Sequence, residues 1–177
     1  MADGRRLVVV RHAKSEYPLG VPDHDRPLNP RGRRDAPLIG AWLEGHLDWS
    51  ADAAPTVLVS TATRAQQTWQ LARTGLGGRW DAVAQRDEPR IYEAPTQTLL
   101  DIVGALPDDC RTAILVGHNP GLVGLIGFAC VRDAAYLTAV EKFPTSAVAV
   151  LRTDLDWRQA VAGDGGFRVA EFAIPRG

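Results

Sequence analysis

Short runs of apolar, often β-branched residues alternate along the chain with longer segments whose apolar residues recur at helical spacing. Four of the short runs are apolar nearly throughout, at residues 6–10, 56–60, 112–117 and 146–151. Strands that are buried on both faces of a sheet have this pattern. We therefore expect these runs to be strands of a mostly parallel sheet.

The segments between the runs are predicted to be helices, at residues 29–47, 63–75, 96–107 and 119–130. Asn29 is a capping residue, and Pro30 suits the first turn of the helix that follows it. Pro37 should delay or bend the start of that helix because it lacks an N–H donor. Gly75 is expected to end the second helix.

The C-terminal segment, residues 157–174, is predicted to form a β-hairpin around Asp164-Gly165-Gly166, antiparallel at the sheet edge. The alternation of strands and helices indicates an α/β fold, a three-layer α/β/α sandwich with a mostly parallel sheet.

Composition and charge narrow the range of functions. The chain has 177 residues, 45% hydrophobic and 23% charged, so we expect residues 1–177 to form a single globular domain. The net charge of -1 gives no field for attracting nucleic acid or an anionic membrane, and neither is expected as a partner. No apolar run suits a signal peptide or a membrane span. We expect a soluble, cytoplasmic protein, and the sequence leaves its oligomeric state open.

The chain has no pattern typical of a metal site. Cys110 and Cys130 lack the Cys-x-x-Cys spacing, and we expect reduced, structural cysteines rather than a disulfide. There is no carboxylate cluster and no His-x-x-x-His spacing. The prediction is a protein without a metal or other cofactor.

Polar residues follow three of the predicted strands, and open α/β sheets bind ligands beyond the carboxyl ends of their strands. Arg11 and His12 end the first run, Arg64 lies in the first turn of the helix after the second, and His118 follows the third. Two Arg and two His should thus gather at one rim, beside a helix N-terminus that favours anions. The pattern predicts a phosphate pocket.

Each of these residues also has an ordinary interpretation. His12 fits a surface or turn histidine, His118 a structural cap, and Arg64 a solvated helix residue. A single Arg-His pair is close to chance in a chain this rich in Arg. The coincidence of all of them at one rim is what favours the phosphate pocket.

Four segments in order resemble one family. "VVVRHAKS" resembles the Arg-His signature of the histidine phosphatase superfamily of phosphoglycerate mutases and acid phosphatases, in the form found in short SixA-type phosphohistidine phosphatases. "DHDRPLNPRGRRDAPLIGAWL" resembles the segment that follows it, and "LVGHNPGL" matches the second-histidine motif. "STATRAQQT" is similar to Ser-Pro-x-x-Arg-Ala-x-Gln-Thr, with Thr61 in place of Pro. The resemblance covers most of the chain and implies a phosphoglycerate mutase-like fold.

The resemblance implies a nucleophilic His12, whose phosphoryl oxygens are bound by Arg11, Arg64 and His118. Independent chemistry agrees, because phosphoryl transfer needs in-line positioning and neutralised oxygens, which two Arg and a protonated His supply without a metal. A neutral His12 is the form that attacks, and a covalent intermediate divides hydrolysis into two easier steps.

The family position for a proton donor is approached by "EPRIYEAPTQT", which makes Glu93 the candidate, although a solvated loop carboxylate fits as well. Ser15 is expected to add a hydroxyl to the phosphate. Lys14 is expected to be exposed.

Asp23, Asp25 and Arg26 fit either the rim of the pocket or a loop ion pair.

The substrate is inferred from the missing lid insertion. Only 25 positions separate Glu93 from His118, and a helix and a strand nearly fill them, so the pocket should be open. An open pocket suits a phosphorylated protein side chain, and a leaving imidazole needs a general acid less than an alkoxide does. The expected partner is thus a phosphohistidine protein.

Two alternatives stay open. One is a phosphatase or mutase that acts on a small phosphorylated metabolite by the same chemistry. The other is a non-catalytic phosphate-recognition module.

Overall fold

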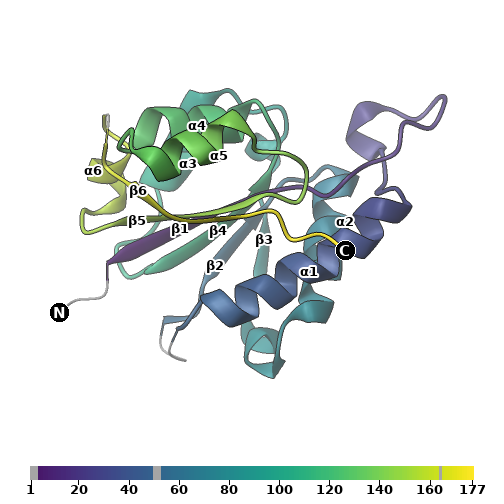
Figure 1. The fold of residues 1–177 in the computed structure, drawn as a ribbon, viewed down its shortest axis with the longest axis horizontal. Helices are drawn as coiled ribbons and strands as arrows, with labels where there is room; N and C mark the ends of the chain where they lie inside the picture. The colour runs from purple at the N-terminus through teal and green to yellow at the C-terminus, as the bar shows by residue number, and fades with distance from the viewer. Residues whose placement is uncertain (1–3, 50–52, 164) are drawn as a thin grey trace.

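The computed structural model describes residues 4–49, 53–163 and 165–177. These residues form a six-stranded sheet between two layers of helices, which confirms the predicted α/β class (Figure 1). The strands are β1 (Arg5–Arg11), β2 (Thr56–Val59), β3 (Gln85–Asp87), β4 (Thr112–Gly117), β5 (Val148–Thr153) and β6 (Arg168–Ala173). The helices are α1 (Pro30–His46), α2 (Thr63–Ala72), α3 (Thr96–Gly104), α4 (Gly121–Ala129), α5 (Ala134–Glu141) and α6 (Trp157–Ala160).

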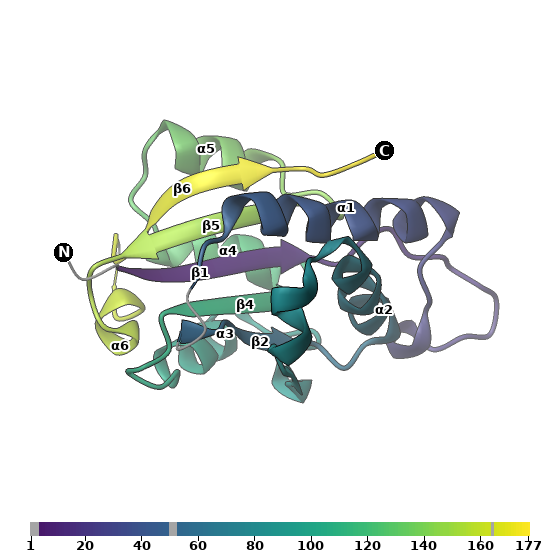
Figure 2. The same ribbon diagram turned by 90° about the horizontal axis from the view of Figure 1, so that it is seen from below.

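The sheet has the strand order β3-β2-β4-β1-β5-β6. The pairs β1–β4, β4–β2 and β2–β3 are parallel, whereas β5 is antiparallel to both β1 and β6. The sheet is therefore mostly parallel, as predicted, and β5 alone of the described strands runs against the others. Because β1, β2 and β4 are neighbours, their carboxyl ends meet at one edge (Figure 2).

Alternation along β1 divides the core into two layers. Leu7 and Val9 pack on the face covered by α3, α4, α5 and α6, and Val8 and Val10 pack on the face covered by α1 and α2. All four side chains are at most 1% exposed. A parallel strand covered on both faces explains why its sequence is apolar without a break.

Helix α1 begins where the sequence indicated. The Asn29 side chain accepts a hydrogen bond from the backbone N–H of Gly32 at 2.8 Å, and Pro30 is the first helical residue. The helix continues through Pro37, so the expected delay of its start is wrong. Burial of Ile39 and Leu43, each 0% exposed, stabilises the helix beyond the proline.

The prediction of a hairpin at residues 157–174 is wrong in its first half. Trp157 begins the short helix α6, because Asp156 and Gln159 form a capping box and the buried indole donates to the Cys110 carbonyl at 3.0 Å. Strand β6 instead pairs with β5, so the expected antiparallel pairing at the sheet edge is confirmed. Asp164 of the expected turn lies outside the described residues.

Two further elements were not predicted. Strand β3 consists of Gln85, Arg86 and Asp87, which have no apolar pattern. Helix α5 follows Asp133, whose side chain accepts from the backbone N–H of Tyr136 at 2.9 Å.

The two cysteines, Cys110 and Cys130, are buried and free, as expected. No helix in the described ranges is both long and apolar enough to cross a membrane.

Candidate active site

Three neighbouring strands deliver the predicted polar residues to one edge of the sheet. His12 follows β1 and His118 follows β4, and the backbone N–H of His12 donates to the Gly117 carbonyl at 3.0 Å. The two imidazole rings lie with centroids 5.0 Å apart and planes tilted by 50°. Parallel pairing of β1 with β4 therefore places the two histidines in contact, although 106 positions separate them in the sequence.

His12 is held in one tautomer. Its Nδ1 lies 2.7 Å from the carbonyl of Ala13, and a carbonyl can only accept, so Nδ1 carries the proton and Nε2 keeps its lone pair. Burial, followed by the charges of His118, Arg64 and Arg11, lowers the pKa of His12 to about 3 despite the hydrogen bond to Ala13. The ring is thus neutral at physiological pH, the form that can attack phosphorus.

His118 is also neutral in the free site. Burial is the main cause that lowers its pKa to about 4, and Arg64 and Arg11 lower it further. Its Nε2 lies 2.8 Å from the Ser60 hydroxyl. In the free protein, burial and two nearby guanidinium groups oppose a positive charge on this ring. A bound phosphate dianion would raise this pKa.

Arg64, near the start of α2, is 6% exposed and faces a carboxylate. Its Nη1 and Nη2 donate to the backbone carbonyl and the Oδ2 of Asp23 at 2.5 and 2.8 Å. Burial raises the pKa of Asp23, but hydrogen bonds from Arg26, Arg64 and Tyr92 outweigh it and lower the pKa to about 2. An anionic oxygen already lies on the Arg64 fork, as a phosphate oxygen would.

Arg11, the last residue of β1, lines a different cavity from Arg64 and His118, one of about 470 Å³ beside Asn119 and Phe143. Its Nη1 and the side-chain amide of Asn119 both donate to the Phe143 carbonyl, each at 2.8 Å. The Nε of Arg11 is buried without a partner among the described residues. Burial lowers its pKa. Arg11 therefore has an unused donor, while its charge is close enough to lower the pKa of His12.

Glu93 lies at the same site as Arg64 and His118. These three residues and Asp23 line a cavity of about 480 Å³. The backbone of Glu93 is in the left-handed region, with φ of 51°, which is strained for a residue with a Cβ. Strain of this kind is common at functional positions.

Ser15 is engaged elsewhere. Its hydroxyl accepts from Nη2 of Arg26 at 2.9 Å, and Ser15 forms an isolated bridge with Leu28. Asp23 and Arg26, at 2.5 Å, form the ion pair that the sequence left open. The structure thus makes Ser15 part of the loop before α1.

Two residues at the site, Ser60 and Tyr92, were not predicted from the sequence. Ser60, at the end of β2, contacts the His118 ring. Tyr92 packs its ring edge against His118 at 5.8 Å between centroids, and its hydroxyl donates to Asp23 at 3.0 Å. The position of Ser60 directly after a strand was a signal that could have identified it. Tyr92 had none, because its contacts depend on the loop around Asp23.

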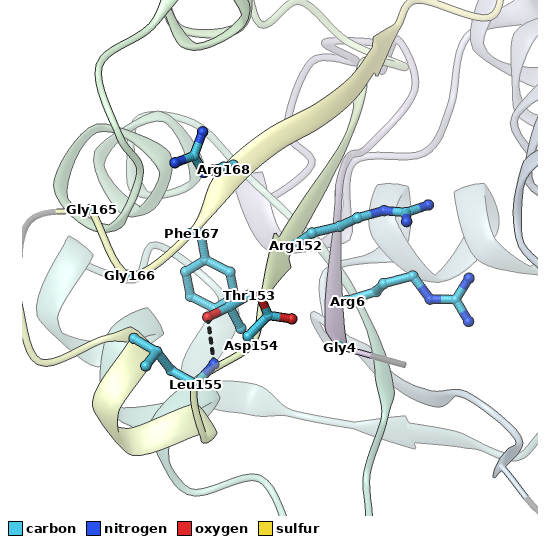
Figure 3. A pocket seen from close by; sticks show the side chains of 10 residues that line it. All are labelled: Gly4, Arg6, Arg152, Thr153, Asp154, Leu155, Gly165, Gly166, Phe167 and Arg168. Atoms are coloured by element: carbon cyan, nitrogen blue, oxygen red, sulfur yellow. Dashed lines mark hydrogen bonds between the residues drawn. The ribbon is translucent and has the colours of Figure 1, made fainter. Parts of the chain in front are cut away.

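A larger cavity, of about 670 Å³, lies at the opposite end of the sheet. Arg6, Arg152 and Arg168 line it, and Figure 3 shows Arg168 pointing away from the other two. Because the Arg168 guanidinium points away from those of Arg6 and Arg152, this cavity lacks the convergent groups of the histidine site. Within the described ranges, no group of three or more His, Cys, Asp or Glu is placed to hold a metal ion.

Comparisons with known proteins agree with this geometry. The family model described as histidine phosphatase superfamily (branch 1) matches residues 7–110. The uncharacterised protein Rv1276c of Mycobacterium tuberculosis is 42% identical over 171 residues, covering 94% of this chain and 100% of that protein.

Solved structures show the same similarity. A protein from Nakamurella multipartitia assigned as the phosphohistidine phosphatase SixA is 31% identical, covers 98% of each chain and superposes with a TM-score of 0.79. Phosphoglycerate mutase from Plasmodium falciparum, at 16% identity and a TM-score of 0.60, shares the fold over 98% of this chain and 92% of its own.

Proposed function

Because the chain belongs to the histidine phosphatase superfamily and is of the SixA type, we propose that it hydrolyses phosphohistidine in proteins through a phosphorylated His12. Proteins of this family type are phosphatases. The mechanism and the substrate are the parts that we propose. The observation that carries it is the buried, neutral His12, whose Nδ1 is occupied and whose Nε2 is free to attack.

In the first step, Nε2 of His12 attacks phosphorus and the bond from phosphorus to the leaving nitrogen breaks. The electron pair of that bond goes to the leaving imidazole, which takes up a proton. In the second step, a water molecule attacks the phosphorus on His12. The P–Nε2 bond breaks, its electron pair returns to the ring, and inorganic phosphate leaves.

The oxygens of the transferred group need positive partners in both steps. Arg64 and the unused Nε of Arg11 supply fixed donors, and His118 gains a second N–H donor once the phosphate dianion raises its pKa. Asp23 must release Arg64 as the phosphate arrives, because a carboxylate and a phosphate oxygen compete for the same fork. These donors stabilise the transferred group without a metal.

Glu93 is the proposed proton donor to the leaving group and proton acceptor from the attacking water. Its place at the cavity that Arg64 and His118 line supports this role. A leaving imidazole of near-neutral basicity depends little on such a donor. The proposed preference for phosphohistidine over alkyl phosphates follows from this difference.

Covalent trapping tests the nucleophile. Brief exposure to a ³²P-labelled phosphohistidine domain and acid-free denaturation should leave label on the wild-type chain, and the label should be absent from His12→Ala. His46→Ala, which removes an exposed histidine of α1, is the matched control and should label normally. Label that persists in His12→Ala would assign the nucleophile to another residue.

A further inference from the structure

A turn at the rim of the site carries apolar side chains that the fold does not bury. Tyr17 is 75%, Leu19 102% and Val21 36% exposed. Figures 1 and 2 show the segment between β1 and α1 extending beyond the edge of the sheet. We call these three side chains the apolar lip.

The turn is built in a way that points Leu19 outward. The backbone N–H of Val21 donates to the Pro18 carbonyl at 3.3 Å, and Gly20 has a φ of +77°. A positive φ at the third position is the requirement of a type II turn, which Gly meets without strain. Leu19 therefore occupies the corner of a tight turn, and its exposure follows from the backbone.

Polar contacts hold the base of the turn. The Arg26 guanidinium is buried and donates to the Glu16 carbonyl at 2.8 Å, the Ser15 hydroxyl at 2.9 Å and the Asp23 carboxylate at 2.5 Å. It also lies 3.3 Å from the centroid of the Tyr17 ring. These polar contacts hold the turn in place. The turn is therefore ordered although its apolar side chains are exposed.

The lip stands beside the proposed phosphate pocket. Asp23, two residues after Val21, lines the 480 Å³ cavity and binds Arg64, whereas no lip residue lines that cavity. A small phosphometabolite inside the cavity would not reach Leu19. A phosphorylated side chain on a folded protein brings the surface around it against the rim.

We propose that the apolar lip is a docking surface for the phosphoprotein substrate, and that it contacts an apolar patch beside the phosphorylated histidine. The proposal rests on the proposed function. Leu19 fits this role because it is exposed and rigidly presented, so its burial against a partner removes apolar surface from water with little ordering cost. Protein interfaces bury apolar side chains at their centre and keep polar groups at the rim.

The test compares two substrates with Leu19→Ser. A phosphotransfer domain carrying phosphohistidine should lose roughly tenfold in kcat/KM through KM, the size of effect expected when one anchoring side chain is truncated. Hydrolysis of phosphoimidazole should be unchanged, because it depends on the cavity alone. Leu155→Ser is the matched control, an exposed leucine at the opposite end of the sheet, and should leave both activities unchanged.

The outcomes separate the two proposals. Equal losses on both substrates, or no loss on either, would overturn the docking role while the proposed function stands. Failure of the wild-type protein to hydrolyse the phosphorylated domain, with phosphoimidazole still cleaved, would overturn protein phosphohistidine as the substrate and the docking surface with it. A loss of kcat/KM on the phosphorylated domain alone would support the docking role of the apolar lip.

Discussion

At the scale of single residues, burial and nearby charge act together on the two histidines. His12 and His118 lie within contact of each other, and both are next to Arg64 and Arg11, so a proton on either ring meets positive charge and low polarity. Neither imidazole ring of the free site is therefore protonated at physiological pH. The positive charge of the site comes from guanidinium groups, which stay protonated under all physiological conditions.

This arrangement predicts a pH dependence of stability. The pKa of His12 is about 3 in the folded chain and about 6.5 in an unfolded one, so between these values the unfolded state binds the extra proton. The free energy of unfolding should fall as the pH is lowered from about 7 to about 5. Urea titrations of wild type and His12→Gln measure this, with a smaller fall expected for the variant. An equal fall in both would show that His12 ionises normally.

Glu93 gives a second prediction at this scale. Glu93→Gln should slow hydrolysis of an alkyl phosphoester by about 10²-fold or more, the usual value of a general acid, and slow phosphohistidine hydrolysis much less. Steady-state rates on both substrates measure the ratio. Glu88→Gln, which alters a nearby carboxylate paired with Arg90, serves as the control. Equal slowing of both substrates would contradict the leaving-group argument.

At the scale of elements, the helices position the site by close backbone contacts. Helices α1 and α2 meet where Gly40 faces the Ala72 carbonyl, and a Cβ on Gly40 would lie 1.8 Å from that oxygen. This contact holds α2, and with it Arg64, against the helix that follows the lip. Only glycine permits so close an approach.

Two alanine substitutions in α1 distinguish the effect of this contact on stability from the effect of helix propensity. Gly40→Ala should destabilise the protein by about 1–3 kcal/mol, because the clash is with backbone. Gly45→Ala, where a Cβ meets nothing within 4 Å, should be neutral or stabilising by up to about 1 kcal/mol. Thermal or urea unfolding measures both. A Gly40→Ala protein as stable as wild type would mean that the two helices can separate at no cost.

At the scale of the whole molecule, the neighbouring carboxyl ends of three parallel strands make one rim. That rim holds the histidines, and the loops from β1, β2 and β4 surround them. Ligand binding at such a site stabilises the entire fold by mass action, because the unfolded chain has no comparable cluster.

Inorganic phosphate should therefore raise the melting temperature. At about 100 times its dissociation constant, the stabilisation should reach about 2.7 kcal/mol. Calorimetry with and without phosphate measures it. Arg64→Gln should abolish the shift, whereas Arg168→Gln, at the far end of the sheet, should keep it. A shift retained in Arg64→Gln would place the phosphate elsewhere.

The sequence by itself determined the strands of the parallel core, the capped start of α1 and the grouping of His12, Arg64 and His118 at one rim. These follow from periodicity, from local capping and from the rule that parallel strands end together. Glu93 also lies at the cavity where the motifs indicated it.

Only the tertiary structure decided the rest. Helix α6 replaced the first half of an expected hairpin because the Trp157 indole is buried against Cys110, far away in the sequence. Asp23 accepts hydrogen bonds from the Arg64 guanidinium, and Ser15 accepts one from Arg26. These contacts also join separate parts of the chain. The protonation of His118 depends on how many charges surround a buried ring. These properties depend on contacts between distant segments and on the loss of water that accompanies those contacts. A local sequence pattern predicts neither.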